Sequence, residues 1–167
     1  IMTGERPAES TARSKYKEIE PYRSMTKTRR ALTWRLILDW SDERVWKTIE
    51  RHKIQPHPCY ELGWSRCSCQ ICIFSSKNTW ASIFEINPEK VARIDEIGQE
   101  IGHTLYADKK NPVTVMQHMV EKGTSFIQPE AKERWIEEAL GVFKSPIFVT
   151  SWKLPAGALN SESSGAT

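Results

Sequence analysis

The amino-acid sequence predicts an α/β fold that contains more helix than strand. Amphipathic stretches flanked by helix-start and helix-stop residues recur along the chain, whereas apolar, partly β-branched stretches are few and short. All four cysteines lie between residues 59 and 72, which predicts a cysteine-rich loop among these elements. With 167 residues, 39% hydrophobic and 27% charged, the chain suits one soluble domain or part of a larger one.

The N-terminal half begins with a polar, basic arm, residues 1–30, which we expect to be a solvated segment. Residues 31–40 are apolar and predict an extended, buried segment. Ser41 then provides an N-cap for a helix over 42–52. Pro56 and Pro58 end that helix and lead into the cysteine loop, residues 57–74.

The C-terminal half alternates helix and strand signals. Asn87-Pro88 is a strong helix start, and Asn111-Pro112 predicts another helix that ends before Gly123. The chain from residue 155 to residue 167 is rich in Gly, Ala and Ser and predicts a flexible tail. The remaining expectations are helices over 78–85, 88–101 and 129–140 and strands over 104–106 and 145–152.

The cysteines follow the pattern Cys59-x7-Cys67-x-Cys69-x2-Cys72. A C-x2-C turn lets two thiolates approach one metal, so Cys69 and Cys72 are the expected ligands. Cys59 and Cys67 are further candidates, and four thiolates would complete a zinc site or a [4Fe–4S] cluster. The alternatives are that Cys59 and Cys67 are small apolar side chains and that the Cys69/Cys72 pair is inert.

Two neighbours bear on this loop. His57 is an alternative fourth ligand in place of Cys59, although a loop histidine more often makes ordinary hydrogen bonds. Arg66 places a cation beside the thiolates, which favours their ionised form.

A second candidate site lies in the basic arm, in the motif Gly4-x-Arg6-x-x-Glu9-Ser10. The glycine allows a close backbone approach, Arg6 offers a bidentate fork to phosphate or sulfate, and Ser10 adds a hydroxyl. Glu9 would orient Arg6, and Arg13 would extend the anionic site. The alternative is a solvated surface loop.

Several segments together resemble the phosphoadenosine phosphosulfate reductase family, in particular its phage and prophage branch. The resemblance covers nearly the whole chain, in family order. Its pieces are Thr3-Gly-Glu-Arg-Pro-Ala-Glu-Ser10, Trp34-Arg-Leu-Ile-Leu-Asp-Trp40, Val45-Trp46, His57-Pro-Cys-Tyr60, Gly63-Trp-Ser-Arg66, Ser68-Cys-Gln-Ile-Cys-Ile-Phe74 and Leu154-Pro-Ala-Gly-Ala158.

The resemblance implies the adenine-nucleotide α-hydrolase-like, or PP-loop, fold, with a parallel sheet between helices. The family's Ser-Gly-Gly-x-Asp-Ser phosphate loop does not occur in these residues. We therefore expect residues 1–154 to be the C-terminal portion of such a domain, with a missing N-terminal PP-loop segment or chain as partner. In cluster-bearing members an upstream cysteine pair joins a downstream C-x2-C pair, which Cys69 and Cys72 resemble.

The implied function is to bind an adenine nucleotide or sulfonucleotide in sulfur metabolism or sulfur transfer. Whether the chain is an enzyme stays open, between a sulfonucleotide reductase and an ATP pyrophosphatase of the PP-loop type, and the isolated chain is expected to be inactive. The alternative is a non-catalytic regulatory module that binds a nucleotide or nucleic acid through a zinc-stapled loop. No apolar run predicts a membrane span and no export signal is visible, so a cytoplasmic location is expected.

Overall fold

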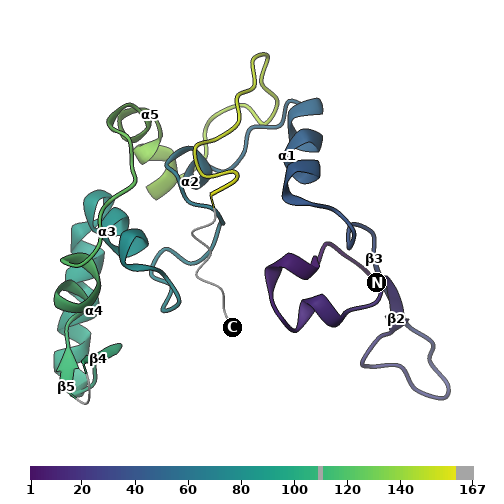
Figure 1. Cartoon of the computed structure of the whole chain (residues 1–167), viewed down its shortest axis with the longest axis horizontal. Helices are drawn as coiled ribbons and strands as arrows, with labels where there is room; N and C mark the ends of the chain where they lie inside the picture. The colour runs from purple at the N-terminus through teal and green to yellow at the C-terminus, as the bar shows by residue number, and fades with distance from the viewer. Residues whose placement is uncertain (109–110, 161–167) are drawn as a thin grey trace. The chain divides into compact units, whose positions relative to one another are not determined.

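The computed structural model describes residues 1–108 and 111–160 (Figure 1). The chain divides into two compact units. Residues 1–47 form the first, called here the N-terminal unit, and the described residues from 48 onward form the second, the C-terminal unit. Among the described residues no helix is both long and apolar enough to span a membrane.

The N-terminal unit is built on a three-stranded sheet in the order β1-β3-β2. Strand β1 (Met2–Thr3) runs parallel to β3 (Leu32–Arg35), and β2 (Ile19–Pro21) runs antiparallel to it. Two 3-10 turns, η1 (Pro7–Glu9) and η2 (Arg13–Lys15), lie between β1 and β2. Residues 1–30, expected to be a solvated arm, therefore contribute two strands and two helical turns.

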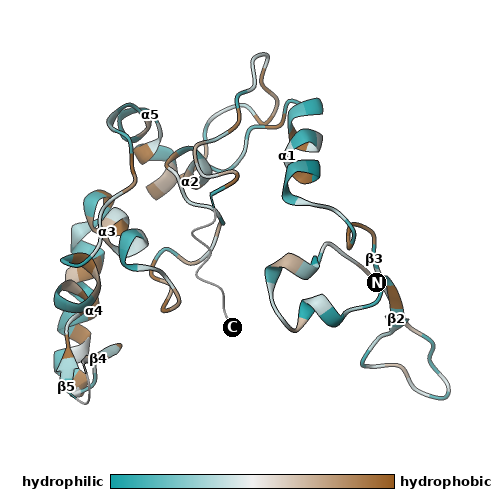
Figure 2. Cartoon of the chain, viewed as in Figure 1, coloured by the Kyte–Doolittle hydropathy of each residue, from teal (hydrophilic) through white to brown (hydrophobic). Residues whose placement is uncertain are grey.

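The expectation of a buried apolar segment over 31–40 is wrong. Only Leu32–Arg35 is a strand, and its buried side chains are the polar Thr33 and Arg35. Leu32 and Trp34 point to the opposite face, where they are 52% and 42% exposed. Figure 2 shows hydrophobic stretches among the strands of this unit. Successive side chains of a strand point to opposite faces, so Thr33 and Arg35 share one face and Leu32 and Trp34 share the other. Polar groups from residues 5–20 surround Arg35 and bury its face, which leaves the apolar face uncovered.

Helix α1 (Asp42–Arg51) begins where its cap predicts. The hydroxyl of Ser41 accepts the Arg44 N–H at 3.3 Å, and Asp42 and Glu43 occupy the first turn, where carboxylates favour the helix dipole. Trp46 is the buried residue of this helix.

The C-terminal unit is helical, with α2 (Pro58–Glu61), α3 (Lys77–Ile86), α4 (Pro88–Ile101) and α5 (Pro129–Leu140). Ser76 caps α3 through the Thr79 N–H, and Asn87 caps α4 through the Lys90 N–H. The helices predicted over 78–85, 88–101 and 129–140 are confirmed. Each begins at a capping residue or a proline that local chemistry specifies.

Two apolar clusters hold this unit together. One is built around Trp80 and Ile83 of α3, both fully buried, with Val91 of α4 packed beside them. The other joins Leu62 and Ile86 to Ile127 and Trp135 of α5. The first cluster also contains Val115, Met119 and Val120.

The predicted helix starting at Asn111-Pro112 is wrong. Asn111–Val113 forms strand β5, which pairs antiparallel with β4 (Tyr106–Asp108). The helical segment comes later, as the π-type turn η3 (Met116–Val120). Asp95 of α4 sets this start, because its carboxylate accepts the N–H groups of Val115, at 2.7 Å, and Met116, at 3.3 Å. A local sequence pattern cannot predict a cap that a residue twenty positions away supplies.

The C-terminal segment also departs from expectation. In the described residues of 145–152, pairing is limited to a single bridge between Phe148 and Ile54. Pro155, Gly157 and Ala158, which were predicted to lie in a flexible tail, are buried, and the Gly157 N–H donates to the Tyr60 carbonyl at 2.9 Å. The predicted tail over 161–167 lies outside the described residues.

Candidate functional site

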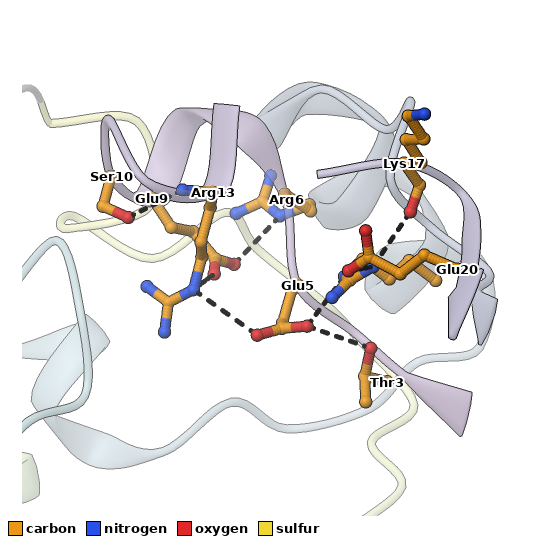
Figure 3. A network of polar contacts seen from close by, with 9 residues as sticks. Thr3, Glu5, Arg6, Glu9, Ser10, Arg13, Lys17 and Glu20 are labelled. Carbon is orange, nitrogen blue, oxygen red and sulfur yellow. Dashed lines mark hydrogen bonds and ion pairs between the residues drawn. The ribbon is translucent and has the colours of Figure 1, made fainter. Parts of the chain in front are cut away.

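A buried arginine, Arg35, organises the polar face of the N-terminal sheet. Figure 3 shows the network of polar contacts to which its partners Glu5 and Glu20 belong. The Arg35 guanidinium donates to Glu5 at 2.9 Å and to the Lys17 carbonyl at 2.9 Å, and it pairs with Glu20 at 2.8 Å. The Tyr16 ring lies 4.1 Å from its central carbon. Burial opposes its charge, but the hydrogen bonds that it donates to Glu5 and Glu20 outweigh this and raise the pKa of Arg35.

The residues of the predicted anion site lie together beside this arginine. Arg6 pairs with Asp42 at 2.6 Å and with Glu9 at 3.5 Å. Arg13 pairs with the other oxygen of Glu9 at 3.4 Å and approaches Glu5 at 3.9 Å. Glu9 therefore bridges the two arginines, and Figure 3 shows its carboxylate between them. The expected contact between Glu9 and Arg6 is present.

Ser10 has a structural contact as well. Its hydroxyl oxygen accepts the Arg13 N–H at 3.2 Å, which leaves the hydroxyl proton free for donation. The cations of this network already face carboxylates, so an incoming phosphate or sulfate has to compete with them. The network, called here the Arg35 network, comprises Glu5, Arg6, Glu9, Arg13, Glu20, Arg35 and Asp42.

The cysteine loop forms the second candidate site. His57 caps the short helix α2, since its Nδ1 accepts the Cys59 N–H at 3.1 Å, and buried Pro58 occupies the first helical position. The chain then turns back at Gly63, whose φ of +107° suits glycine alone. The Cys67 N–H donates to the Tyr60 hydroxyl at 3.2 Å, which returns the loop to α2.

This turn gathers three metal-ligand side chains. One ligand atom from each of His57, Cys59 and Cys67 lies within 4.8 Å of the other two. Cys59 is half-buried and Cys67 is exposed. Burial, with a further contribution from the neighbouring Cys67 thiol, raises the pKa of Cys59 strongly.

The predicted pair Cys69 and Cys72 lies apart from this group. Within residues 1–108 and 111–160 neither belongs to a set of three His, Cys, Asp or Glu ligand atoms as close as the His57 group. Cys69 is exposed and Cys72 is half-buried. The Arg66 guanidinium lies 3.7 Å from the Cys72 sulfur, so the expected cation beside the cysteines is present.

Two features of these sites escape sequence reasoning. His57 appears there only as a substitute for Cys59, whereas the structure places both in one group with Cys67. The available signal is His-Pro-Cys, because a histidine N-cap followed by proline brings its ring over the second helical residue. The other feature is the buried Arg35. Its available signal is that it is the one charged residue within residues 31–38.

Comparison with known proteins finds a similarity that includes both candidate sites. Residues 1–75, which include both candidate sites, match the phosphoadenosine phosphosulfate reductase domain. A 37.8 kDa protein from Escherichia phage 186, described as uncharacterised, is 43% identical over 63 residues. The match covers 38% of this chain, and the chain spans about a fifth (19%) of the length of that relative. No solved structure matches the chain. The similarity to the phosphoadenosine phosphosulfate reductase domain thus covers a little under half of the chain.

Proposed function

We propose that this chain is part of a phosphoadenosine phosphosulfate reductase-like protein that binds an adenine nucleotide or sulfonucleotide and acts in sulfur metabolism or sulfur transfer. The observation that carries the proposal is the family match over residues 1–75, because that range includes the Arg6 motif and the cysteine loop. In the same proposal the cysteine loop holds zinc or an iron–sulfur cluster.

Arg6 and Arg13 are the proposed ligands of the phosphate or sulfate group. Glu9 contacts both, so it can hold the two guanidinium groups side by side, and the Ser10 hydroxyl has a proton to donate. Binding an anion requires Arg6 to exchange its Asp42 contact for the ligand. This exchange favours a doubly charged ligand, which competes better with a carboxylate than a singly charged one does.

The N-terminal unit also has a surface that suits completion by further protein. The strand register places Met2 and Ile19 beside Trp34, and their exposed fractions are 70%, 55% and 42%. An apolar sheet face is normally covered by another layer. This supports a phosphate-loop-bearing segment or chain as the partner that packs on this face and completes the nucleotide site.

Calorimetric titration tests the proposal. Adenosine phosphosulfates and ATP are titrated into the chain reconstituted with a phosphate-loop-bearing segment of the family. Removing one charge-assisted contact costs about 1.5–3 kcal/mol, so Arg6→Ala should weaken binding roughly tenfold to a hundredfold. Arg6→Lys should recover only part of this, because an ammonium lacks the bidentate fork.

Arg93→Ala is the matched control, since Arg93 is an exposed, carboxylate-paired arginine of α4 in the C-terminal unit. It should bind like wild type. Equal affinity of wild type and Arg6→Ala would instead show that the Arg6 motif is only a surface loop. The chain alone should produce neither sulfite nor pyrophosphate, because these 167 residues contain no Gly-rich phosphate loop.

A second candidate function, a nucleic-acid-binding regulatory module, is favoured by one segment. The loop over 22–31 joins β2 to β3 and carries Arg23, Lys27, Arg29 and Arg30, with no Asp or Glu between Glu20 and Asp39. Such a loop suits a phosphate backbone. Fluorescence anisotropy with a short single-stranded DNA tests it. Affinity that falls steeply with salt and is lost when the four cations become Gln would favour the module.

A further inference from the structure

The group formed by His57, Cys59 and Cys67 has dimensions close to those of a metal site. Its three ligand atoms lie within 4.8 Å of one another. In a tetrahedral zinc site, bonds of about 2.3 Å to sulfur and about 2.0 Å to nitrogen place the ligand atoms about 3.5 Å apart. The separations in the group, at most 4.8 Å, are therefore of the same order as those in a zinc site.

We propose that His57, Cys59 and Cys67 bind one Zn²⁺ ion, with an open fourth position, and that Cys69 and Cys72 are not its ligands. This inference deepens the proposal that the cysteine loop holds a metal or cluster, and it rests on that proposal. It names the ion and the residues, and both differ from the four-cysteine arrangement that the spacing alone indicates.

The backbone around the group is anchored, which limits the entropy lost when the ion binds. The Cys59 carbonyl accepts the Trp64 N–H at 3.0 Å, and the Cys67 N–H is held by the Tyr60 hydroxyl. The Tyr60 carbonyl in turn accepts the Gly157 N–H. Gly157 packs so tightly that a Cβ atom there would lie 2.0 Å from the Trp64 carbonyl oxygen. The segment around Gly157 thus packs against the cysteine loop and holds its backbone in place.

The donor types select the metal. Two thiolates and one imidazole are ligands that zinc prefers, and the group contains no carboxylate of the kind that Ca²⁺ and Mg²⁺ require. Two thiolates also neutralise the charge of the ion. A [4Fe–4S] cluster needs four thiolates, and this group supplies only two. The open fourth position leaves room for water or a substrate atom.

His57 makes the proposal more specific. Its Nδ1 accepts the Cys59 N–H, so in the neutral ring Nε2 carries the proton. A metal bond at Nδ1 takes over the electron pair that accepts this hydrogen bond, and a metal bond at Nε2 places the proton on Nδ1. Either way the ion replaces the N-cap bond of α2. His57→Asn keeps a capping side chain and removes the imidazole, so it separates the two roles.

The experiment uses the full chain, purified anaerobically, with metal analysis and titration of Zn²⁺ against a competing chelator. Wild type should hold about one zinc per chain and no acid-labile sulfide. Cys59→Ser and Cys67→Ser should each weaken zinc binding roughly a hundredfold or more, and His57→Asn roughly tenfold or more. Cys69→Ser and Cys72→Ser are matched controls from the same loop and should retain wild-type affinity. Cobalt substitution adds a readout, because thiolate-to-metal charge-transfer absorption reports how many sulfurs remain bound.

Circular dichroism identifies variants that fail to fold, and Cys67→Ser keeps the test usable because Cys67 is exposed. Zinc that is lost in Cys69→Ser or Cys72→Ser would overturn the ligand assignment while the loop remained a metal site. Iron with sulfide would also overturn it. A Cys59–Cys67 disulfide without bound metal would assign the pair to redox chemistry and overturn both metal proposals. Nucleotide titration of the same variants is independent of all these outcomes and tests the Arg6 site alone.

Discussion

The two units of this chain are held together by opposite kinds of chemistry. At the centre of the N-terminal unit is a buried arginine surrounded by carboxylates, and its apolar strand residues face outward. The C-terminal unit is centred on Trp80 and Ile83, both fully buried, and its charged side chains lie mostly at the surface. Apolar burial contributes net stability, whereas a buried ion pair often does little more than offset its own desolvation.

The two units therefore differ in what they require for stability. The C-terminal unit has an apolar core of its own, and its helices have local caps. The N-terminal unit specifies one arrangement of its loops through the Arg35 network but leaves Leu32 and Trp34 exposed. We therefore expect the C-terminal unit to provide most of the stability of the chain, and the N-terminal unit to gain stability from whatever covers its sheet.

The largest expected effect compares two tryptophans. Trp80→Ala removes a fully buried side chain from α3 and should destabilise the C-terminal unit by about 3–5 kcal/mol. Trp34→Ala removes a half-exposed side chain and should cost below about 1 kcal/mol. Urea denaturation followed by circular dichroism measures both. Similar costs at the two positions would show that the sheet face of the N-terminal unit is already covered.

The Arg35 network can be broken directly. Arg35→Met leaves Glu5 and Glu20 without their shared cation, so we expect the N-terminal unit to lose its ordered structure. Amide hydrogen exchange on the full chain should show loss of protection in residues 2–35, with α3 and α4 unchanged. Retained protection in β3 would mean that strand pairing alone holds the unit.

A glycine tests the support of the cysteine loop. Gly157→Ala places a methyl group against the Trp64 backbone, so it should destabilise the C-terminal unit by about 1–3 kcal/mol. Gly102→Ala is the matched control, because a Cβ there meets no atom within 4 Å and only the left-handed backbone opposes it. A smaller cost at Gly157 than at Gly102 would contradict the packing described for the loop.

The smallest predicted effect depends on pH. Ser125 donates to Glu85, and Lys132 pairs with it at 3.1 Å, and together these contacts lower the pKa of Glu85 against the opposing effect of burial. A lowered folded-state pKa means that the stabilisation is complete above the unfolded carboxyl pKa of about 4.3 and is lost as the pH falls through the folded value.

Glu85→Gln should therefore cost about 1 kcal/mol at pH 7, since solvent screens a side chain that is 32% exposed. The cost should shrink as the pH falls below about 4. Denaturation midpoints from pH 3 to pH 7 measure it, with the exposed Glu89→Gln as control. A difference that stays constant with pH would place the cost in packing rather than in charge.

Local sequence signals specify the helices whose start depends on neighbouring residues. Helices α4 and α5 begin at the predicted Asn87-Pro88 and Pro129, whereas α3 begins at Lys77, one residue before the predicted start, after its cap Ser76. The contact between Arg6 and Glu9 is also local, since it follows from short sequence separation. The helix starts at Asn87-Pro88 and Pro129 were correctly predicted because their signals are neighbours in the chain.

Other features depend on partners that are distant in the chain, so they follow from tertiary packing. Asp95 sets the start of η3 from the neighbouring helix, so Asn111-Pro112 became strand rather than helix. The apolar pattern of β3 could not indicate which face is buried, because that depends on Glu5 and Glu20 reaching Arg35. The choice of Cys67 rather than Cys69 as the neighbour of Cys59 likewise follows from the long-range support of the loop. Spacing along a chain limits which residues can meet, but the packing of distant segments selects which of them do.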